Sequence, residues 1–317
     1  MTALWPWSDP GVHAAMLAAA LAWDRWVGEP PIAVHPVVWM GTAIGWMRNR
    51  APAGSAGAFA WGLVMALVLP AASAAVSLVV LVPGVGALLG AWLLTSSFAL
   101  RGLPAAGEAV AAALDNGDLE SARTGLRSLC SRDPAGLTAV EVSAAATESV
   151  AENCSDSLVA PLFWYAIGGL PMAMAYRCVN TLDAMVGYRG RYEWLGKPSA
   201  RLDDVLNVIP ARLSAAALLV AGATMPRLSV RRGLRVLWAD RNNTSSPNAG
   251  WPMAATAGLL GVELGKTDHY VLGQGLGECT GSALEEGCAV SERAMWLAAA
   301  VVVAAFVGAA VAHPSWI

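Results

Sequence analysis

Long apolar stretches with at most one charged residue are the feature that most constrains how this chain folds. A helix needs about 20 mostly apolar residues to cross the hydrocarbon core of a bilayer, and within that core every backbone polar group must be paired inside a helix or a closed barrel. Four segments fit the helical pattern, namely Ala56–Val82, Val85–Leu100, Val208–Met225 and Ala294–Ala312. They predict a fold built from membrane helices.

Two further apolar stretches are interrupted. Val12–Val27 ends at the charged pair Asp24 and Arg25, which makes it a marginal span. Leu158–Val179 contains two adjacent glycines and a proline, so it is either a kinked span or a re-entrant hairpin. We therefore predict an all-α integral membrane protein, a polytopic helical bundle of about four to six membrane segments with helical cytoplasmic loops.

The composition supports the membrane prediction and excludes other classes. Hydrophobic residues make up 56% of the 317 residues and charged residues only 14%, against roughly 25% charged residues in soluble globular proteins. With 20 Lys and Arg against 23 Asp and Glu, the net charge of -3 provides no basic field for a nucleic acid. The five cysteines are not spaced as zinc ligands, so we expect reduced and mostly packed thiols.

The apolar segments are separated by polar stretches within a single polytopic membrane domain, residues 1–317. These stretches, 102–156, 181–207 and 227–293, are expected to carry the active site. Five arginines near the start of the last stretch place it in the cytoplasm by the positive-inside rule. We expect a multi-pass protein of the cytoplasmic membrane, with 102–156 on the same side. If both segments that flank 181–207 cross the bilayer, this stretch faces the other side or dips back through a water-filled cavity.

One predicted helix carries carboxylates along one face. In Thr138–Asn153, Glu141, Glu148 and Glu152 stand at i, i+7 and i+11, and Asp156 continues the line if the helix does. Such a stripe is either a solvated helix face or a group of metal or substrate ligands. Because it runs into an apolar segment and has no lysine or arginine at i+4, we expect unpaired carboxylates with a functional role. The catalytic candidates are Glu148, Glu152 and Asp156.

A second polar group precedes the apolar segment that begins at Val208. Asp203 and Asn207 are four residues apart, so both can reach one ligand, and Asp204 adds a carboxylate. These three residues are the predicted metal ligands, because Mg²⁺ is a hard cation that takes few protein oxygens and keeps its waters and substrate phosphates. Arg212, one turn inside the apolar run, is either a snorkelling arginine or a clamp on a phosphate group.

Two other segments supply polar side chains. Asn180 and Asp183 are three residues apart and share a helix face. The loop that contains Ser246 and Asn248 precedes a helix start. It is therefore either an anion cradle made by helix N-terminal amides or an ordinary turn with a cap.

Several motifs of this chain occur together in one known family. They are SRD from Ser131, ESVAENCSDSLVAP from Glu148, NTLDAMVGY from Asn180, YEWLGKPSARLDDVLNVIPARL from Tyr192 and SPNAGWPMAA from Ser246. In order and spacing they resemble the CobD/CbiB family of cobalamin-biosynthesis membrane proteins. Asp24, Arg25 and the run from Gly28 to Pro36 resemble the N-terminal segment of that family, with Glu29 where Asp is usual.

This resemblance implies adenosylcobinamide-phosphate synthase activity, an ATP-dependent amide ligation of adenosylcobyric acid with (R)-1-amino-2-propanol or its O-phosphate. It implies Mg²⁺ with ATP as co-substrate, placed at the Asp203 group with Arg212 as the clamp. The acidic stripe would then hold a second metal, bind the aminopropanol ammonium or remove its proton. The candidates for substrate or nucleotide contacts are Asn153, Asn180, Asp183, Tyr192, Arg212, Ser246 and Asn248.

Two other classes of function remain as alternatives. A transporter would use broken helices such as the one expected at Gly168 and Gly169, but it would not need several dense polar motifs outside the spans. A non-catalytic membrane scaffold for other corrinoid-pathway enzymes would not need acids beside buried arginines. The expected partners are the bilayer, the three substrates and other corrinoid-pathway membrane enzymes, with no nucleic acid.

Overall fold

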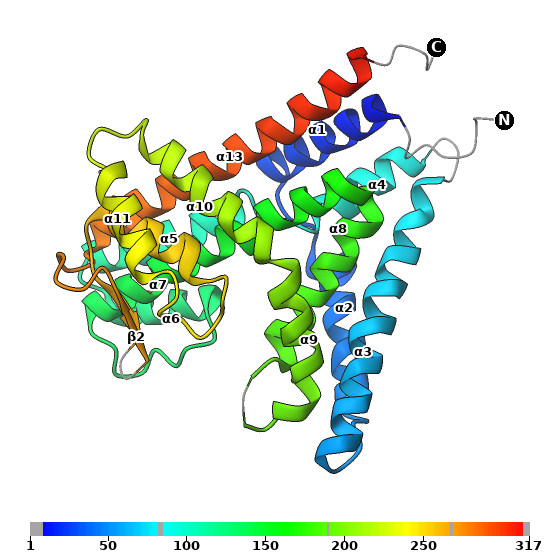
Figure 1. The fold of residues 1–317 in the computed structure, drawn as a ribbon, viewed down its shortest axis with the longest axis horizontal. Coiled ribbons are helices and arrows are strands. Elements are labelled where there is room, and N and C mark those ends of the chain that lie inside the picture. The colour runs from blue at the N-terminus through cyan, green and yellow to red at the C-terminus, as the bar shows by residue number, and fades with distance from the viewer. Residues whose placement is uncertain (1–8, 82–84, 189, 267–268, 313–317) are drawn as a thin grey trace. The chain divides into compact units, whose positions relative to one another are not determined.

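The structure, a computed structural model, describes residues 9–81, 85–188, 190–266 and 269–312. The chain forms two compact units, each assembled from segments that are distant in the sequence. Unit 1 comprises Met1–Ala99, Ala160–Asn207 and Ala299–Ile317, and unit 2 comprises Leu100–Val159 and Val208–Ala298. Helices and one short hairpin make up the secondary structure (Figure 1), which confirms the helical class.

Unit 1 is a group of helices. It contains α1 (Pro10–Trp26), α2 (Pro36–Arg48), α3 (Ser55–Val76), α4 (Gly86–Thr95), α8 (Ala160–Val186), α9 (Glu193–Leu206), the 3₁₀ turns Ile32–Val34 and Ser77–Leu81, and the end of α13 (Gly281–Ala312). α3 packs along both α8 and α9, and α1 packs on α4. One core of this unit joins Ile44 of α2, Met65 of α3, Leu182 of α8 and Leu195 of α9.

Side-chain caps fix where the first helices begin. Asp9 accepts a hydrogen bond from the Gly11 N–H (2.7 Å), and His35 Nδ1 accepts one from the Val37 N–H (3.2 Å). In both cases a proline occupies the first helical position, where its missing N–H costs nothing. His35 therefore has a structural role at the start of α2.

The predicted break in the segment Leu158–Val179 is present inside α8. Gly168 and Gly169 leave the helical conformation, and Gly169 has a φ of 64°, which a residue with a side chain rarely adopts. Pro171 follows within the same element. The backbone of α8 is thus kinked by the residues that the sequence indicated.

Unit 2 combines helices with the hairpin. It contains α5 (Gly102–Asp115), α6 (Leu119–Leu129), α7 (Ala139–Cys154), the π-helical turn Ser155–Val159, α10 (Val208–Gly222), α11 (Val230–Asp240), α12 (Gly250–Leu260), β1 (Leu264–Lys266), β2 (Tyr270–Leu272) and the start of α13. The strands are antiparallel, with Leu264 opposite Leu272. Unit 2 therefore brings together residues from both stretches that were expected on the cytoplasmic side.

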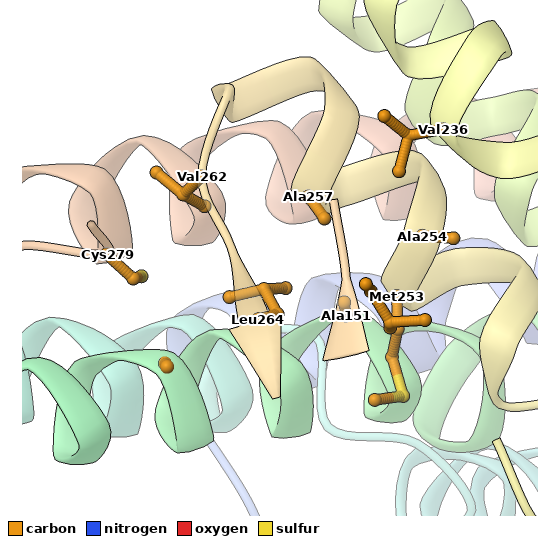
Figure 2. Packing of buried hydrophobic residues seen from close by; sticks show 10 residues of the cluster. Ala151, Val236, Met253, Ala254, Ala257, Val262, Leu264 and Cys279 are labelled. Atoms are coloured by element: carbon orange, nitrogen blue, oxygen red, sulfur yellow. The ribbon is translucent and has the colours of Figure 1, made fainter. Parts of the chain in front are cut away.

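The core of unit 2 lies where α7, α11, α12 and the hairpin meet. Figure 2 shows Ala151, Val236, Met253 and Leu264 among the side chains that fill it. Cys279 lies at its edge, where Ser143 and Thr147 contact the sulfur. All five cysteines are free thiols, as expected, and four of them are buried.

Fewer helices are long enough to span a bilayer than expected. Among the described residues, Ser55–Val79, Ala139–Val186 and Gly281–Ala312 qualify by length and apolar composition, and α9 with α10 make a fourth if they count as one span. The prediction of a span at Val85–Leu100 is wrong. The helix there, α4, has 10 residues and at 1.5 Å per residue covers only about half of the hydrocarbon core.

Replacing Gly62 by alanine tests the close approach of α3 to α9. A Cβ atom at Gly62 would overlap the carbonyl group of Leu195, so the two helices must separate. We expect Gly62→Ala to lower the free energy of unfolding by about 1–3 kcal/mol, measured as a lower thermal midpoint in detergent. Gly45→Ala in α2 is the matched control, because a Cβ there meets no atom within 4 Å. Equal midpoints for the two variants would contradict this packing.

Candidate functional site

The predicted site residues fall into groups in each unit. Glu148, Glu152, Asn153, Asp156, Arg212, Ser246 and Asn248 belong to unit 2, and Asn180, Asp183, Tyr192, Asp203, Asp204 and Asn207 belong to unit 1.

The acidic face of α7 contains a buried ion pair. Arg132 Nη2 donates to Glu148 Oε2 at 3.1 Å, and the two side chains are only 18% and 6% exposed. The expectation of unpaired carboxylates is therefore wrong for Glu148. Its partner comes from the loop that precedes α7 and not from the next helical turn. A search for a lysine or arginine four residues further along the helix therefore does not find it.

The other oxygen of this carboxylate has a different environment. Among the described residues, Glu148 Oε1 is buried and has no hydrogen-bond partner. Tyr270 of β2 interacts with Glu148. The pKa of the Tyr270 hydroxyl is raised by burial and then by the negative charges of Glu148 and Glu152. The site therefore combines two carboxylates with an arginine and a tyrosine.

The first carboxylate of the stripe has a structural role. Glu141 accepts hydrogen bonds from the N–H and the hydroxyl group of Thr138, both at 2.8 Å, and the Thr138 hydroxyl accepts one from the Glu141 N–H. This capping box starts α7. The stripe is thus divided between a helix cap at its beginning and the buried pair two turns later.

The end of α7 leads into the π-helical turn. Asn153 donates from Nδ2 to the Ser149 carbonyl group (2.9 Å) and accepts at Oδ1 from the Ser157 hydroxyl (3.5 Å). Asp156 lies in the π-helical turn itself, so the helix continues through this position in a wider form. Such turns are frequent at functional sites.

In unit 1 a hydrogen-bonded group joins α8 to α9. Asn207 Nδ2 donates to Asp203 Oδ2 at 2.9 Å, and Asn180 Nδ2 donates to Asp203 Oδ1 at 3.5 Å. Tyr176 in turn donates to Asn207 Oδ1 at 2.9 Å. The amide of Asn207 is thus engaged at both ends, and Asp203 is held by two amides.

Two more carboxylates belong to this group. Asp183 and Asp204 interact electrostatically, and Asp204 Oδ2 lies 3.6 Å from Arg201 Nη1. Within the described ranges, no three His, Cys, Asp or Glu side chains are grouped closely enough to hold a metal ion by themselves. The oxygen donors are of the type that Mg²⁺ prefers, and a site with few protein ligands suits an ion that keeps several waters.

Arg212 and the loop before α12 meet in unit 2. Arg212 Nη1 donates to Asn248 Oδ1 at 3.2 Å, and its guanidinium lies 4.4 Å from the centre of the Trp251 ring. The Ser246 hydroxyl accepts the N–H groups of Asn248 and Ala249 at 3.2 and 3.4 Å. The loop is therefore a turn stabilised by its serine, with one arginine held above it.

The N-terminal segment places a carboxylate beside a histidine. Glu29 Oε2 lies 3.8 Å from His35 Nε2. The close approach of the His35 side chain lowers the pKa of Glu29. A Glu at this position keeps a negative charge at the start of α2.

Sequence analysis missed two residues of the Glu148 site. Arg132 belongs to the SRD run from Ser131, which is one of the family motifs, but the sequence does not show that its partner is Glu148. Tyr270 had no signal in the sequence, because its position depends on the hairpin, whose strand β1 packs on α7.

The chain matches known proteins over nearly its whole length. The family described as CobD/Cbib protein matches residues 17–311. "Cobalamin biosynthesis protein CobD" of Dehalococcoides mccartyi is 45% identical over 261 residues, which cover 80% of this chain and 84% of that protein. The protein of the same name from Klebsiella pneumoniae is 38% identical over 310 residues, 92% of this chain and 97% of that protein.

A relative with the other family name is similar to the same extent. "Cobalamin biosynthesis protein CbiB" of Salmonella typhi is 37% identical over 311 residues, covering 93% of this chain and 97% of that protein. No solved structure matches the chain. Because the family match and the relatives extend across most of the sequence, the chain belongs to the CobD/CbiB family.

Proposed function

We propose that this chain works in cobalamin biosynthesis as an adenosylcobinamide-phosphate synthase, a carbon–nitrogen ligase of the cell membrane. It joins adenosylcobyric acid to (R)-1-amino-2-propanol or its O-phosphate and consumes ATP. The names of the relatives support the pathway, and the apolar helices support a membrane location. The buried Arg132–Glu148 pair, in which one carboxylate oxygen has no hydrogen-bond partner among the described residues, is the observation that supports the chemistry.

Amide formation needs an activated carboxylate and a deprotonated amine. Transfer of a phosphoryl group from ATP to the propionate of adenosylcobyric acid provides a leaving group. The amine nitrogen then forms a bond to the carbonyl carbon, the bond from that carbon to the phosphate oxygen breaks, and the ammonium proton passes to a base. Such chemistry depends mainly on positioning and on charge neutralisation.

In this proposal Glu148 takes the ammonium proton at Oε1. Arg132 holds Oε2 and thereby orients the carboxylate, while Glu152 supplies a second negative charge that attracts the ammonium group. Tyr270 interacts with Glu148 and is proposed to help hold this carboxylate in place. Asp156 and Asn153, at the end of the same helix, remain candidates for contacts with the aminopropanol.

The Asp203 group is the proposed place for Mg²⁺ with the ATP phosphates. Asp203 and Asp204 would be the metal ligands, with Asn207 as a third ligand or, because both ends of its amide are engaged, as the group that orients Asp203. Bound Mg²⁺ would neutralise phosphate charge during transfer. We propose Asn180, Asp183 and Tyr192 as nucleotide or corrinoid contacts of unit 1, and Arg212, Ser246 and Asn248 as phosphate contacts of unit 2.

Direct turnover tests the reaction. The protein purified in detergent is incubated with adenosylcobyric acid, aminopropanol phosphate and Mg-ATP, and the amide product is detected by mass spectrometry. We expect a product that requires all three components. Absence of product from folded protein, with either amine, would favour a transporter or a scaffold instead.

Asp203→Asn tests the metal site. Asparagine keeps one oxygen as an acceptor for the amides around it, so the variant should fold, but it loses the charge that a cation needs. We expect the Mg²⁺ concentration for half-maximal turnover to rise by about 10–100-fold, with partial rescue by Mn²⁺. Asp115→Asn at the exposed end of α5 is the control. An unchanged Mg²⁺ requirement would remove Asp203 from the metal site.

Glu148→Gln tests the proton acceptor. Turnover should fall by about 10²–10⁴-fold while ATP binding persists. Because a rising pH supplies free amine that needs no base, the variant should recover part of its rate at high pH relative to the wild type. A purely structural loss would not recover in this way. Glu120→Gln, whose side chain is 82% exposed, is the control.

A further inference from the structure

A cavity of about 370 Å³ lies in unit 1 where α3 and α9 begin. Its lining includes Arg48 at the end of α2, Gly54 and Ser55 at the start of α3, and Arg191 and Tyr192 before α9. A water molecule takes up about 30 Å³ in the liquid, so the cavity has room for a phosphate-sized group and part of a molecule attached to it.

The charged side chains of the lining are mostly cationic. The guanidinium groups of Arg48 and Arg191 lie 5.7 and 5.3 Å from the centre of the Tyr192 ring. Within the described part of the chain, Arg48 Nε is buried and has no hydrogen-bond partner. Glu193 is the carboxylate that also lines the cavity, which leaves an excess of one positive charge for an anion to neutralise.

Two helices add to this positive potential. α3 and α9 have 22 and 14 residues, and no side chain described by the structure caps the first turn of either helix. The first N–H groups of a helix have no partner inside the helix, and the helix dipole favours negative charge at that end. The first residues of both helices, Ser55 of α3 and Glu193 of α9, line the same cavity as the two arginines.

From these contacts we propose that the cavity between Arg48, Arg191 and Tyr192 binds the phosphate group of a phosphate ester. Arginine presents a planar fork of donors that matches phosphate oxygens, and helix N-terminal amides provide further donors. The inference deepens the proposed function and rests on it where the ester is a substrate of the ligation, because Tyr192 is also a proposed nucleotide or corrinoid contact of unit 1.

The surroundings of the cavity allow two sources of that group. The Arg50 guanidinium lies 3.8 Å from the Trp46 ring centre, and the Lys197 ammonium lies 4.7 Å from the Trp194 ring centre. Tryptophan is enriched at the interface between membrane and water, and Lys and Arg are enriched in the cytoplasmic loops next to it. A phospholipid headgroup and a soluble phosphate ester are therefore both compatible with the chemistry, and the experiment has to separate them.

Binding to full-length protein in nanodiscs tests the proposal. In one arm the nanodiscs contain only zwitterionic phosphatidylcholine, and inorganic phosphate is titrated by calorimetry. In the other arm, phosphatidylglycerol is added and the lipid that stays bound is measured by native mass spectrometry. We expect saturable binding in at least one arm, and Arg191→Gln should weaken it by about tenfold, since a hydrogen bond to a charged group is lost. Binding in the first arm indicates a soluble ester, and binding in the second arm alone indicates a lipid.

Variants connect the binding to this cavity. Arg191 is exposed, so Arg191→Gln should fold normally. Arg48→Gln is a second test, to be used if its thermal midpoint equals that of the wild type. Arg235→Gln removes the same charge from an exposed position of α11 and should bind as the wild type does. The proposal fails if the wild type binds in neither arm, or if Arg212→Gln abolishes phosphate binding while Arg191→Gln leaves it unchanged. Neither result would bear on the turnover assay.

Discussion

Two glycines determine how α9 is held in unit 1. A Cβ atom at Gly196 would overlap the carbonyl group of Val186 at the end of α8, and one at Gly62 of α3 would overlap the carbonyl group of Leu195. α9 is therefore in backbone contact with two neighbours at the same turn. The Asp203 group lies two turns further along α9, and the cavity between Arg48, Arg191 and Tyr192 lies at its start. Both candidate sites of unit 1 thus depend on contacts that only a residue without a side chain permits.

Local sequence signals predicted the fold well. The start of α7 at Thr138 and the break at Gly168 and Gly169 both follow from residues that cap or interrupt helices. The Asp203–Asn207 pair was also predictable, because an i, i+4 spacing on a helix brings the two side chains together.

The errors concern length and long-range contacts. Val85–Leu100 has the composition of a span, but only ten of its residues are helical, and composition alone does not fix where a helix ends. The pairing of Arg132 with Glu148 and the approach of Tyr270 depend on how a loop and a hairpin fold onto α7. A periodicity test along one helix cannot detect partners that come from other elements. A buried ion pair also contributes little net stability compared with apolar packing, which is consistent with a chemical role for this one.

The burial of the cysteines has a practical meaning for redox behaviour. The thiolate is the form that reacts with oxidants and alkylating reagents, and burial raises the pKa of the Cys279 thiol and of the Cys130 thiol. Cys130 is the one cysteine that is partly exposed. The thiols of the native protein should therefore react slowly with alkylating reagents. Once Cys130 is replaced, the labelling of a cysteine introduced at a surface position would measure the accessibility of that position, with little labelling of the native cysteines.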